Sequence, residues 1–261
     1  MLDLFLPLVL VIVGLGAGIL GSLIGVGGGL LMTPALTFLG LNPGQISSTS
    51  LFAVTFASAS STISYSKQKK IRYHLALKIA IIAIPGAISG AFISSLMELE
   101  SFKLYFGILL ILTVIYLATN KSLIREKGKE GTKNGTRFAL SRLIFYSGVF
   151  GAGIISSIFG IGGGIIFVPL LVFVIGMTVA AASPTSQLAL FITSLTGTIT
   201  HAILGHPDYF HAGALATGAF FGGQIGARIS DKVGESLLRK LFSGSLMAVA
   251  AKLIYDFVSQ T

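Results

Sequence analysis

Apolar segments alternate with short polar stretches along the whole chain, and the alternation predicts ten helical segments. Most of them approach the roughly 20 apolar residues that a helix needs to cross a bilayer. Two are shorter and contain Pro34 or Pro169. The pattern predicts an all-α polytopic membrane protein. The predicted segments are 4–23, 30–39, 46–66, 75–97, 102–119, 143–159, 165–176, 185–204, 212–229 and 238–258.

The sequence repeats itself at an offset of about 135 residues. Residues 16–36 and 151–171 share eleven of 21 aligned positions, and the similarity continues downstream with a one-residue shift. Each copy contains five predicted segments, and an odd number of segments places the second copy upside down in the membrane. We therefore predict a first inverted repeat at 1–119, a basic cytoplasmic linker at 120–142 and a second inverted repeat at 143–261.

Each repeat contains a glycine run, GVGGG at 25–29 and GIGGG at 160–164. Glycine costs about 1 kcal/mol relative to alanine in a helix interior, so both runs predict broken helices. Inverted repeats with broken helices are typical of secondary transporters, whose site lies near the membrane midplane. The first two segments of each repeat are either full spans or a re-entrant hairpin. The alternative role, close helix packing, is what we expect of Gly14, Gly16 and Gly18.

Composition and charge agree with a membrane protein. The chain is 53% hydrophobic and only 10% charged, against about 25% charged residues in soluble domains. The net charge of +9 comes largely from the loop at 67–72 and the linker, and basic loops face the cytoplasm. We predict a multi-pass protein of the cell membrane with both termini extracytoplasmic. Its environment is the lipid bilayer, with no nucleic-acid partner, and a homodimer stays open.

A Gly-x-Gly-Gly-Gly run followed by an apolar stretch and a proline, with a Thr-Ser pair downstream, occurs once in each half. This arrangement resembles the sulfite exporter TauE/SafE family of membrane permeases over essentially the whole chain. The resemblance implies an exporter of small sulfur-containing anions such as sulfite, thiosulfate or organosulfonates, working by alternating access. The candidate substrate-binding residues are Gly25, Gly27, Gly28, Gly29, Thr49, Ser50, Gly160, Gly162, Gly163, Gly164, Thr185, Ser186 and Gln187.

Hydroxyl groups can bind an oxyanion without carrying a charge, because they donate hydrogen bonds. Pro184 suits the first position of a helix, which predicts Thr185 and Ser186 at a helix N-terminus. The alternative is that these hydroxyls bond to their own helix or hold helices together. His201, the counterpart of Tyr65, is expected to be an interfacial polar tip.

Other functions have weaker support in the sequence. The chain has no cysteine, which excludes disulfides and thiolate chemistry. We expect no cofactor, no metal site and no catalytic residues, since no cluster of chemically active side chains is evident. A channel or a carrier of a different small solute is the main alternative, and a membrane-embedded enzyme is a weaker one.

Overall fold

The computed structural model describes residues 2–119, 135–230 and 232. In these ranges the chain forms nine helices and no strand, which confirms the all-α class there. The tenth predicted segment, 238–258, and residues 120–134 of the predicted linker lie outside the described residues. The helices are α1 (Leu2–Ile24), α2 (Gly29–Thr37), α3 (Pro43–Lys67), α4 (Tyr73–Ser95), α5 (Leu99–Thr119), α6 (Gly135–Phe159), α7 (Gly164–Phe173), α8 (Val179–Ile203) and α9 (Tyr209–Ile229).

Every described helix begins before its predicted segment, and two begin at least six residues early. Helix α6 begins at Gly135, inside the segment predicted as linker, because an apolar stretch marks the membrane span and not the whole helix. Helix α8 begins at Val179, so Pro184 lies inside it and not at its first position. The prediction that Thr185 and Ser186 lie at a helix N-terminus is therefore wrong.

Two of the described helices are long and apolar enough to cross a membrane, with spans at Phe5–Ile24 and Tyr73–Ser95. Two shorter apolar helices, Leu143–Phe159 and Gly164–Phe173, accompany them. Helix α3 is far less apolar because eight of its 25 residues are serine. Long hydroxyl-rich helices therefore lie among apolar ones, and most of the hydroxyls are buried.

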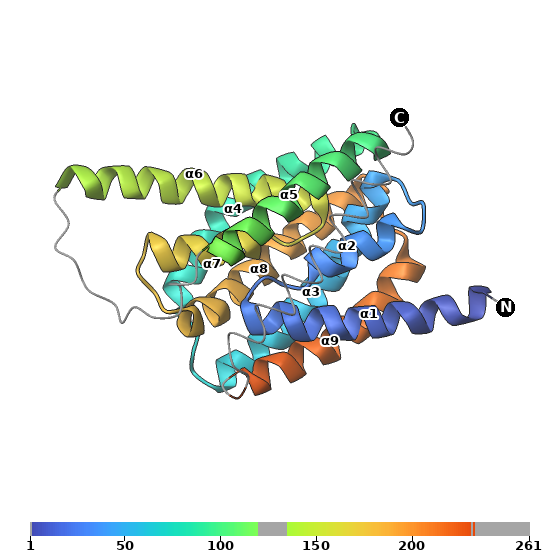
Figure 1. Ribbon diagram of the computed structural model, residues 1–261, viewed down its shortest axis with the longest axis horizontal. Coiled ribbons are helices and arrows are strands. Elements are labelled where there is room, and N and C mark those ends of the chain that lie inside the picture. Colours follow the sequence, from blue (N-terminus) through green and yellow to red (C-terminus); the bar gives the residue numbers. More distant parts are fainter. Residues whose placement is uncertain (1, 120–134, 231, 233–261) are drawn as a thin grey trace.

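Helices from the two halves of the sequence pack in crossed pairs. Helix α1 packs along α9, and α6 packs along α4, as Figure 1 shows. Small residues permit this close approach. A Cβ added at Gly18 would lie 2.6 Å from the carbonyl oxygen of Ala219 on α9, and one added at Gly14 would collide with that of Leu215. Glycine is therefore required on the face of α1 that meets α9.

Gly16 differs from its neighbours. A Cβ added there meets no heavy atom within 4 Å, so the prediction that Gly16 is a packing glycine is wrong. The helical repeat explains the difference, because positions 14 and 18 share one face of α1 while position 16 points away.

Aromatic packing holds α5 against the carboxyl end of α6. The rings of Phe102 and Phe106 on α5 lie 5.3 and 5.5 Å from the ring of Phe159, measured between centroids. Phe159 is the last residue of α6 before its glycine run. The apolar core therefore reaches the point at which this helix breaks.

Candidate functional site: two broken helices that meet

Both glycine runs break a helix along the same backbone path. Helix α1 ends at Ile24 and α2 begins at Gly29, while α6 ends at Phe159 and α7 begins at Gly164. Left-handed φ angles, which favour glycine, occur at matched positions of the two runs: Gly25 (86°), Gly27 (88°) and Gly28 (78°), and Gly160 (73°), Gly162 (85°) and Gly163 (78°). The predicted breaks are confirmed.

The two breaks contact each other. A Cβ added at Gly29 would lie 2.6 Å from the carbonyl oxygen of Gly160, and one at Gly164 would lie 2.5 Å from that of Gly25. Each run therefore uses the missing side chains of the other to approach it closely. All residues of both runs are buried, which is where non-helical backbone at membrane depth is tolerated.

Two apolar side chains lie beside this crossing. A Cβ added at Gly27 would lie 3.2 Å from both Val54 of α3 and Leu190 of α8, and one at Gly162 would lie 2.7 Å from both. Each side chain therefore touches both turns. In this conformation the glycine backbone faces other parts of the protein.

The carboxyl end of α6 is held by side chains from three other helices. The last carbonyl groups of a helix have no partner within it. Here four successive carbonyls accept hydrogen bonds from side chains. The donors are His201 Nε2 to Ser157 (3.1 Å), Ser47 Oγ to Ile158, Thr33 Oγ1 to Phe159 (2.8 Å) and Ser50 Oγ to Gly160 (2.7 Å).

The carboxyl end of α1 is held in a similar way with different residues. The donors are Gln187 Nε2 to Gly21 (2.9 Å), Tyr65 Oη to Ser22 (2.9 Å), Ser183 Oγ to Ile24 (2.8 Å) and Ser186 Oγ to Gly25 (2.7 Å). The Gly21 carbonyl also accepts from the amides of Gly25, Val26 and Gly27. The hydroxyl-rich helices α3 and α8 thus supply most caps of the broken helices.

The hydroxyls predicted to bind substrate differ in their hydrogen-bond partners. Ser50 and Ser186 each donate to the glycine run of the other half. Thr185 donates to the Ala181 carbonyl of its own helix at 2.9 Å and accepts from the Arg72 amide at 3.3 Å. Thr49 is fully buried, and its hydroxyl has no hydrogen-bond partner among the described residues. The structure therefore brings Ser50, Ser186 and Gln187 to the breaks and leaves Thr49 unpaired.

Several residues of this arrangement were not predicted from the sequence: Thr33, Ser47, Ser183 and His201. A signal existed for two of them. Ser47 precedes Ser50 by three residues, and Ser183 precedes Ser186 by three, a spacing that places both hydroxyls on one helix face. His201 was predicted as an interfacial tip, but it is fully buried and caps α6.

The amino ends of α2 and α7 give the site its electrostatic character. Each helix begins after a left-handed glycine, Gly28 or Gly163, that provides no side-chain cap. The amides of a first helical turn and the helix dipole favour a negative charge. Within the described ranges, no three His, Asp or Glu side chains come together as ligands for a metal. The arrangement favours an anion over a cation.

Comparison with known proteins assigns the chain to a group of transporters. The family model described as "Sulfite exporter TauE/SafE" matches residues 10–253. A probable membrane transporter protein of Bacillus subtilis, YunE, is 33% identical over 95% of this chain and 97% of its own length. MJ0441 of Methanocaldococcus jannaschii, also named a probable membrane transporter protein, is 31% identical over 93% of each chain.

A more distant relative has the same kind of name. The probable membrane transporter protein YfcA of Escherichia coli K12 is 28% identical over 95% of this chain and 89% of its own length. No solved structure matches the chain.

Proposed function

The chain belongs to the sulfite exporter TauE/SafE family, and on that premise we propose that it is a secondary transporter that exports small sulfur-containing anions. Sulfite, thiosulfate and organosulfonates are the proposed substrates. The observation that carries the proposal is the contact between two glycine breaks, each of which begins a helix without a side-chain cap.

The two halves are proposed to be inverted repeats. Three features support this: the sequence repeat, the similar left-handed φ angles of the two breaks and the crossed pairing of α1 with α9 and α4 with α6. In Figure 1, α1 runs from right to left while α6 runs from left to right. Helix α2 has nine residues, or about 14 Å at 1.5 Å per residue, less than half of a 30 Å hydrocarbon core. We therefore propose that α1–α2 and α6–α7 are re-entrant pairs.

The substrate is proposed to bind between the two breaks. Amides of the glycine runs would bind the anion's oxygens, because the helix dipole favours negative charge there. Thr49 is next to Ser50, which donates to the Gly160 carbonyl of the second break. The Thr49 hydroxyl is buried and has no hydrogen-bond partner within the described ranges. A polar group buried without a partner carries a free-energy cost, which a ligand can offset.

We propose that the transporter works by alternating access at this crossing. Val54 and Leu190 each touch both turns, so an anion can reach the amides only when the halves separate. Ser50 and Ser186 bridge the halves, and their bonds must break or shift as this happens. Opening on one side at a time would expose the site alternately to the two faces of the membrane.

The test is anion flux in proteoliposomes. The purified protein should pass sulfite, thiosulfate or a small sulfonate faster than empty liposomes, and should discriminate against sugars and amino acids. Thr49→Val should lower this flux about ten- to a hundredfold, the effect of losing a hydrogen bond to a charged group. Thr62→Val is the matched control, because Thr62 lies on the same helix and its hydroxyl is also buried without a hydrogen-bond partner in the part of the chain that the structure describes.

Two outcomes contradict the proposal. One is a chain that moves an unrelated solute and no sulfur oxyanion. The other is a pair of variants that lower flux equally, which would place the substrate site away from Thr49.

The proposed orientation is tested separately with single cysteines, for which the cysteine-free chain is a clean background. A cysteine at Ser101 should react with an impermeant reagent from outside the cell, and one at Gly131 should not. The reverse pattern would overturn the proposed orientation with both termini outside.

A further inference from the structure

Two histidines form a bonded pair at one end of α8. His201 is fully buried, and its Nδ1 lies 2.8 Å from Nδ1 of His206, in the loop after the helix. Its Nε2 lies 3.1 Å from the carbonyl oxygen of Ser157, near the end of α6. His206 is partly exposed. The pair therefore connects the surface to the capped end of a broken helix.

The Ser157 carbonyl fixes the protons of the whole pair. His201 Nε2 also lies 3.4 Å from the Ser157 hydroxyl, but the nearer carbonyl oxygen can only accept, so we assign a proton to His201 Nε2. A neutral ring has one N–H, so the His201 Nδ1 is then an acceptor and the His206 Nδ1 must be the donor. The Nε2 of a neutral His206 is left without a proton. The pair can therefore accept one proton, at Nε2 of the partly exposed His206 ring.

The surroundings favour moving a positive charge inward. The Ser157 carbonyl belongs to the carboxyl end of α6, where the helix dipole stabilises a cation. The His206 ring lies over Gly44, where an added Cβ would come within 3.1 Å of it. Gly44 is in the first turn of α3, and the amino end of a helix disfavours a cation. Both helix dipoles thus favour a positive charge on His201, while the full burial of His201 opposes it.

We propose that His201 and His206 form the proton-binding site that couples the transporter to protons, an inference that rests on the transport function proposed above. A proton adds to Nε2 of His206, and the proton on Nδ1 of His206 moves along the hydrogen bond to Nδ1 of His201. The products are a neutral His206 with its proton on Nε2 and an imidazolium at His201. The pair gains one proton and one positive charge.

The proton's effect on the break follows from this charge. A charged donor makes a hydrogen bond roughly twice as strong as a neutral one, so the imidazolium strengthens the contact between His201 and Ser157. This contact fastens α6 to α8 three residues before Gly160. Loss of the proton weakens it and eases the separation that transport requires.

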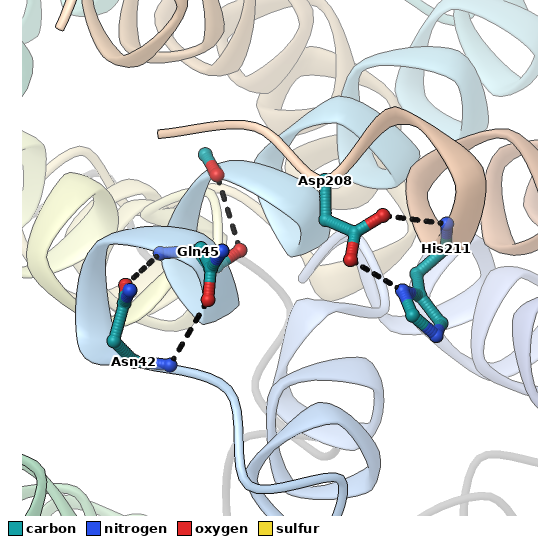
Figure 2. Close-up of polar contacts among 5 residues, drawn as sticks. Asn42, Gln45, Asp208 and His211 are labelled. Atoms are coloured by element: carbon teal, nitrogen blue, oxygen red, sulfur yellow. Dashed lines mark hydrogen bonds and ion pairs between the residues drawn. The ribbon is translucent and has the colours of Figure 1, made fainter. Parts of the chain in front are cut away.

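Helices α6 and α8 place no other charged side chain beside the histidine pair. Residues 143–159 of α6 contain no Asp, Glu, Lys, Arg or His, and α8 contains no titratable residue besides His201. The groups that begin α3 next to His206 are neutral: Asn42 and Gln45 bond to each other in a capping box, as Figure 2 shows. Lys67 is at the other end of α3, and Arg228 is at the other end of α9.

The charged groups at the same end of the molecule include Glu98, Glu100 and Lys103, after α4, Asp3 at the start of α1, and the paired Asp208 and His211 at the start of α9 (Figure 2). Burial opposes the charge of Asp208, but hydrogen bonds from His211 hold the pKa of Asp208 below its usual value. Burial lowers the pKa of His206. Burial therefore opposes protonation at the ring where the proton enters.

The other half provides a natural control. Tyr65 occupies the matched position and caps Ser22 as His201 caps Ser157. The amide of Lys70 bonds to the Tyr65 carbonyl at 3.2 Å, as the amide of His206 bonds to that of His201 at 3.1 Å. Tyrosine titrates near pH 10. His201→Tyr should keep the cap and remove the proton site.

The first test measures the protons without any substrate. The chain has four histidines, so ¹⁵N-histidine NMR of the purified full chain resolves four rings, assigned by single substitutions. Between about pH 8 and pH 5, His201 and His206 should titrate together with one shared inflection, and His201 should become doubly protonated. His74→Gln is the control, because His74 is exposed at the start of α4, and it should leave both curves unchanged. A His201 ring that stays neutral while His206 titrates overturns the proposal.

The second test measures coupling in proteoliposomes that contain a pH dye. The anion flux of the natural protein should change about tenfold per pH unit on one side of the pair's titration, the slope for one proton, and should move protons with it. His201→Tyr should abolish the pH slope. His206→Gln, whose amide still donates to His201 but accepts no proton, should do the same if the tyrosine variant fails to fold. A slope retained in a folded variant overturns the proposal, while a chain that titrates as predicted but moves no sulfur anion counts only against the transport function.

Discussion

The carboxyl ends of α1 and α6 meet the same physical demand with different side chains. Both helices stop at a left-handed glycine turn in the interior, and both leave carbonyl groups that need donors. Ser186 and Ser50 fill equivalent places, each donating to a glycine carbonyl of the opposite half. The other side-chain donors differ between the two ends. The shared serine contact is therefore what both glycine turns require, and the donors that differ can serve another purpose.

The end of α1 is held by groups that do not titrate near neutral pH. Tyr65 caps Ser22, and Gln187 adds a fourth donor to a Gly21 carbonyl that three backbone amides already share. At the end of α6, Leu51 occupies the position that matches Gln187. Ser156 occupies the position that matches Gly21, and its hydroxyl has no hydrogen-bond partner among the described residues. His201 replaces the tyrosine. The second break is thus the one whose attachment can respond to a proton.

The largest effect is expected where the breaks touch. Gly29→Ala and Gly164→Ala each place a methyl group within about 2.6 Å of backbone in the other run. Backbone cannot move aside as a side chain can, so each should lower the free energy of unfolding by about 3 kcal/mol or more. Unfolding of purified protein in mixed micelles measures this.

Gly16→Ala and Gly151→Ala are the matched controls for these variants, since a Cβ added at either position meets no atom within 4 Å. They should leave stability unchanged or raise it by about 1 kcal/mol through helix propensity. Equal losses in all four variants would mean that the breaks do not need to touch.

The next effect concerns the shared serine contacts. Ser50→Ala and Ser186→Ala each leave a buried glycine carbonyl without its donor, at a cost of about 1–3 kcal/mol. Ser50→Ala should cost more, because Ser50 Oγ also lies 3.1 Å from Thr33 Oγ1, which shares its one proton between Ser50 and the Phe159 carbonyl. Ser89→Ala is the control, because Ser89 is exposed and bonds only to its own helix. If Ser186→Ala is the more damaging of the two, the α1 break depends on its serine more than the geometry indicates.

The helices and their breaks could be predicted from the sequence because they depend on local signals. Apolar stretches marked the helices, and glycine runs marked left-handed turns. The separate roles of Gly14, Gly16 and Gly18 were also predictable from helical periodicity, since only the first and last share a face. The prediction failed at Gly16 because Gly14, Gly16 and Gly18 were given the same role.

The partners of the hydroxyls could not be predicted in the same way. Ser50 and Gly160 are 110 residues apart, and Ser186 and Gly25 are 161 apart, so their contacts depend on how the two halves cross. Hydropathy places a histidine near a segment end at the interface. The fold instead buries His201, because the following loop turns back and brings His206 against it.

Gln187→Leu should separate stability from function. The change gives the first break the residue that the second break has at the matched position, Leu51. It removes one hydrogen bond to Gly21 and also the buried Oε1 atom, which has no hydrogen-bond partner among the described residues. Removing both together should change stability by less than about 1 kcal/mol.

Flux should respond differently. If Gln187 contacts the substrate, anion flux should fall about tenfold or more in this stable variant. Flux at the level of the natural protein would exclude Gln187 from the substrate site and leave it as a cap of α1.

The smallest effect is expected at the matched starts of α4 and α9. Arg72 begins α4 without a side-chain cap, whereas Asp208 begins α9 by accepting from the amide of His211 and from its ring nitrogen at 2.6 Å. These bonds lower the pKa of Asp208 against the opposing effect of burial. The stabilisation by the carboxylate is therefore complete above the usual aspartate range, near pH 4, and is lost as the pH falls through the lowered pKa.

Asp208→Asn keeps the capping oxygen and removes the charge, so it should cost less than about 1 kcal/mol for this partly exposed pair. Thermal unfolding of both proteins against pH should show a small constant difference above that range and none in strong acid. A difference that persists after the carboxylate is protonated would mean that Asp208 stabilises α9 by its shape and not by its charge.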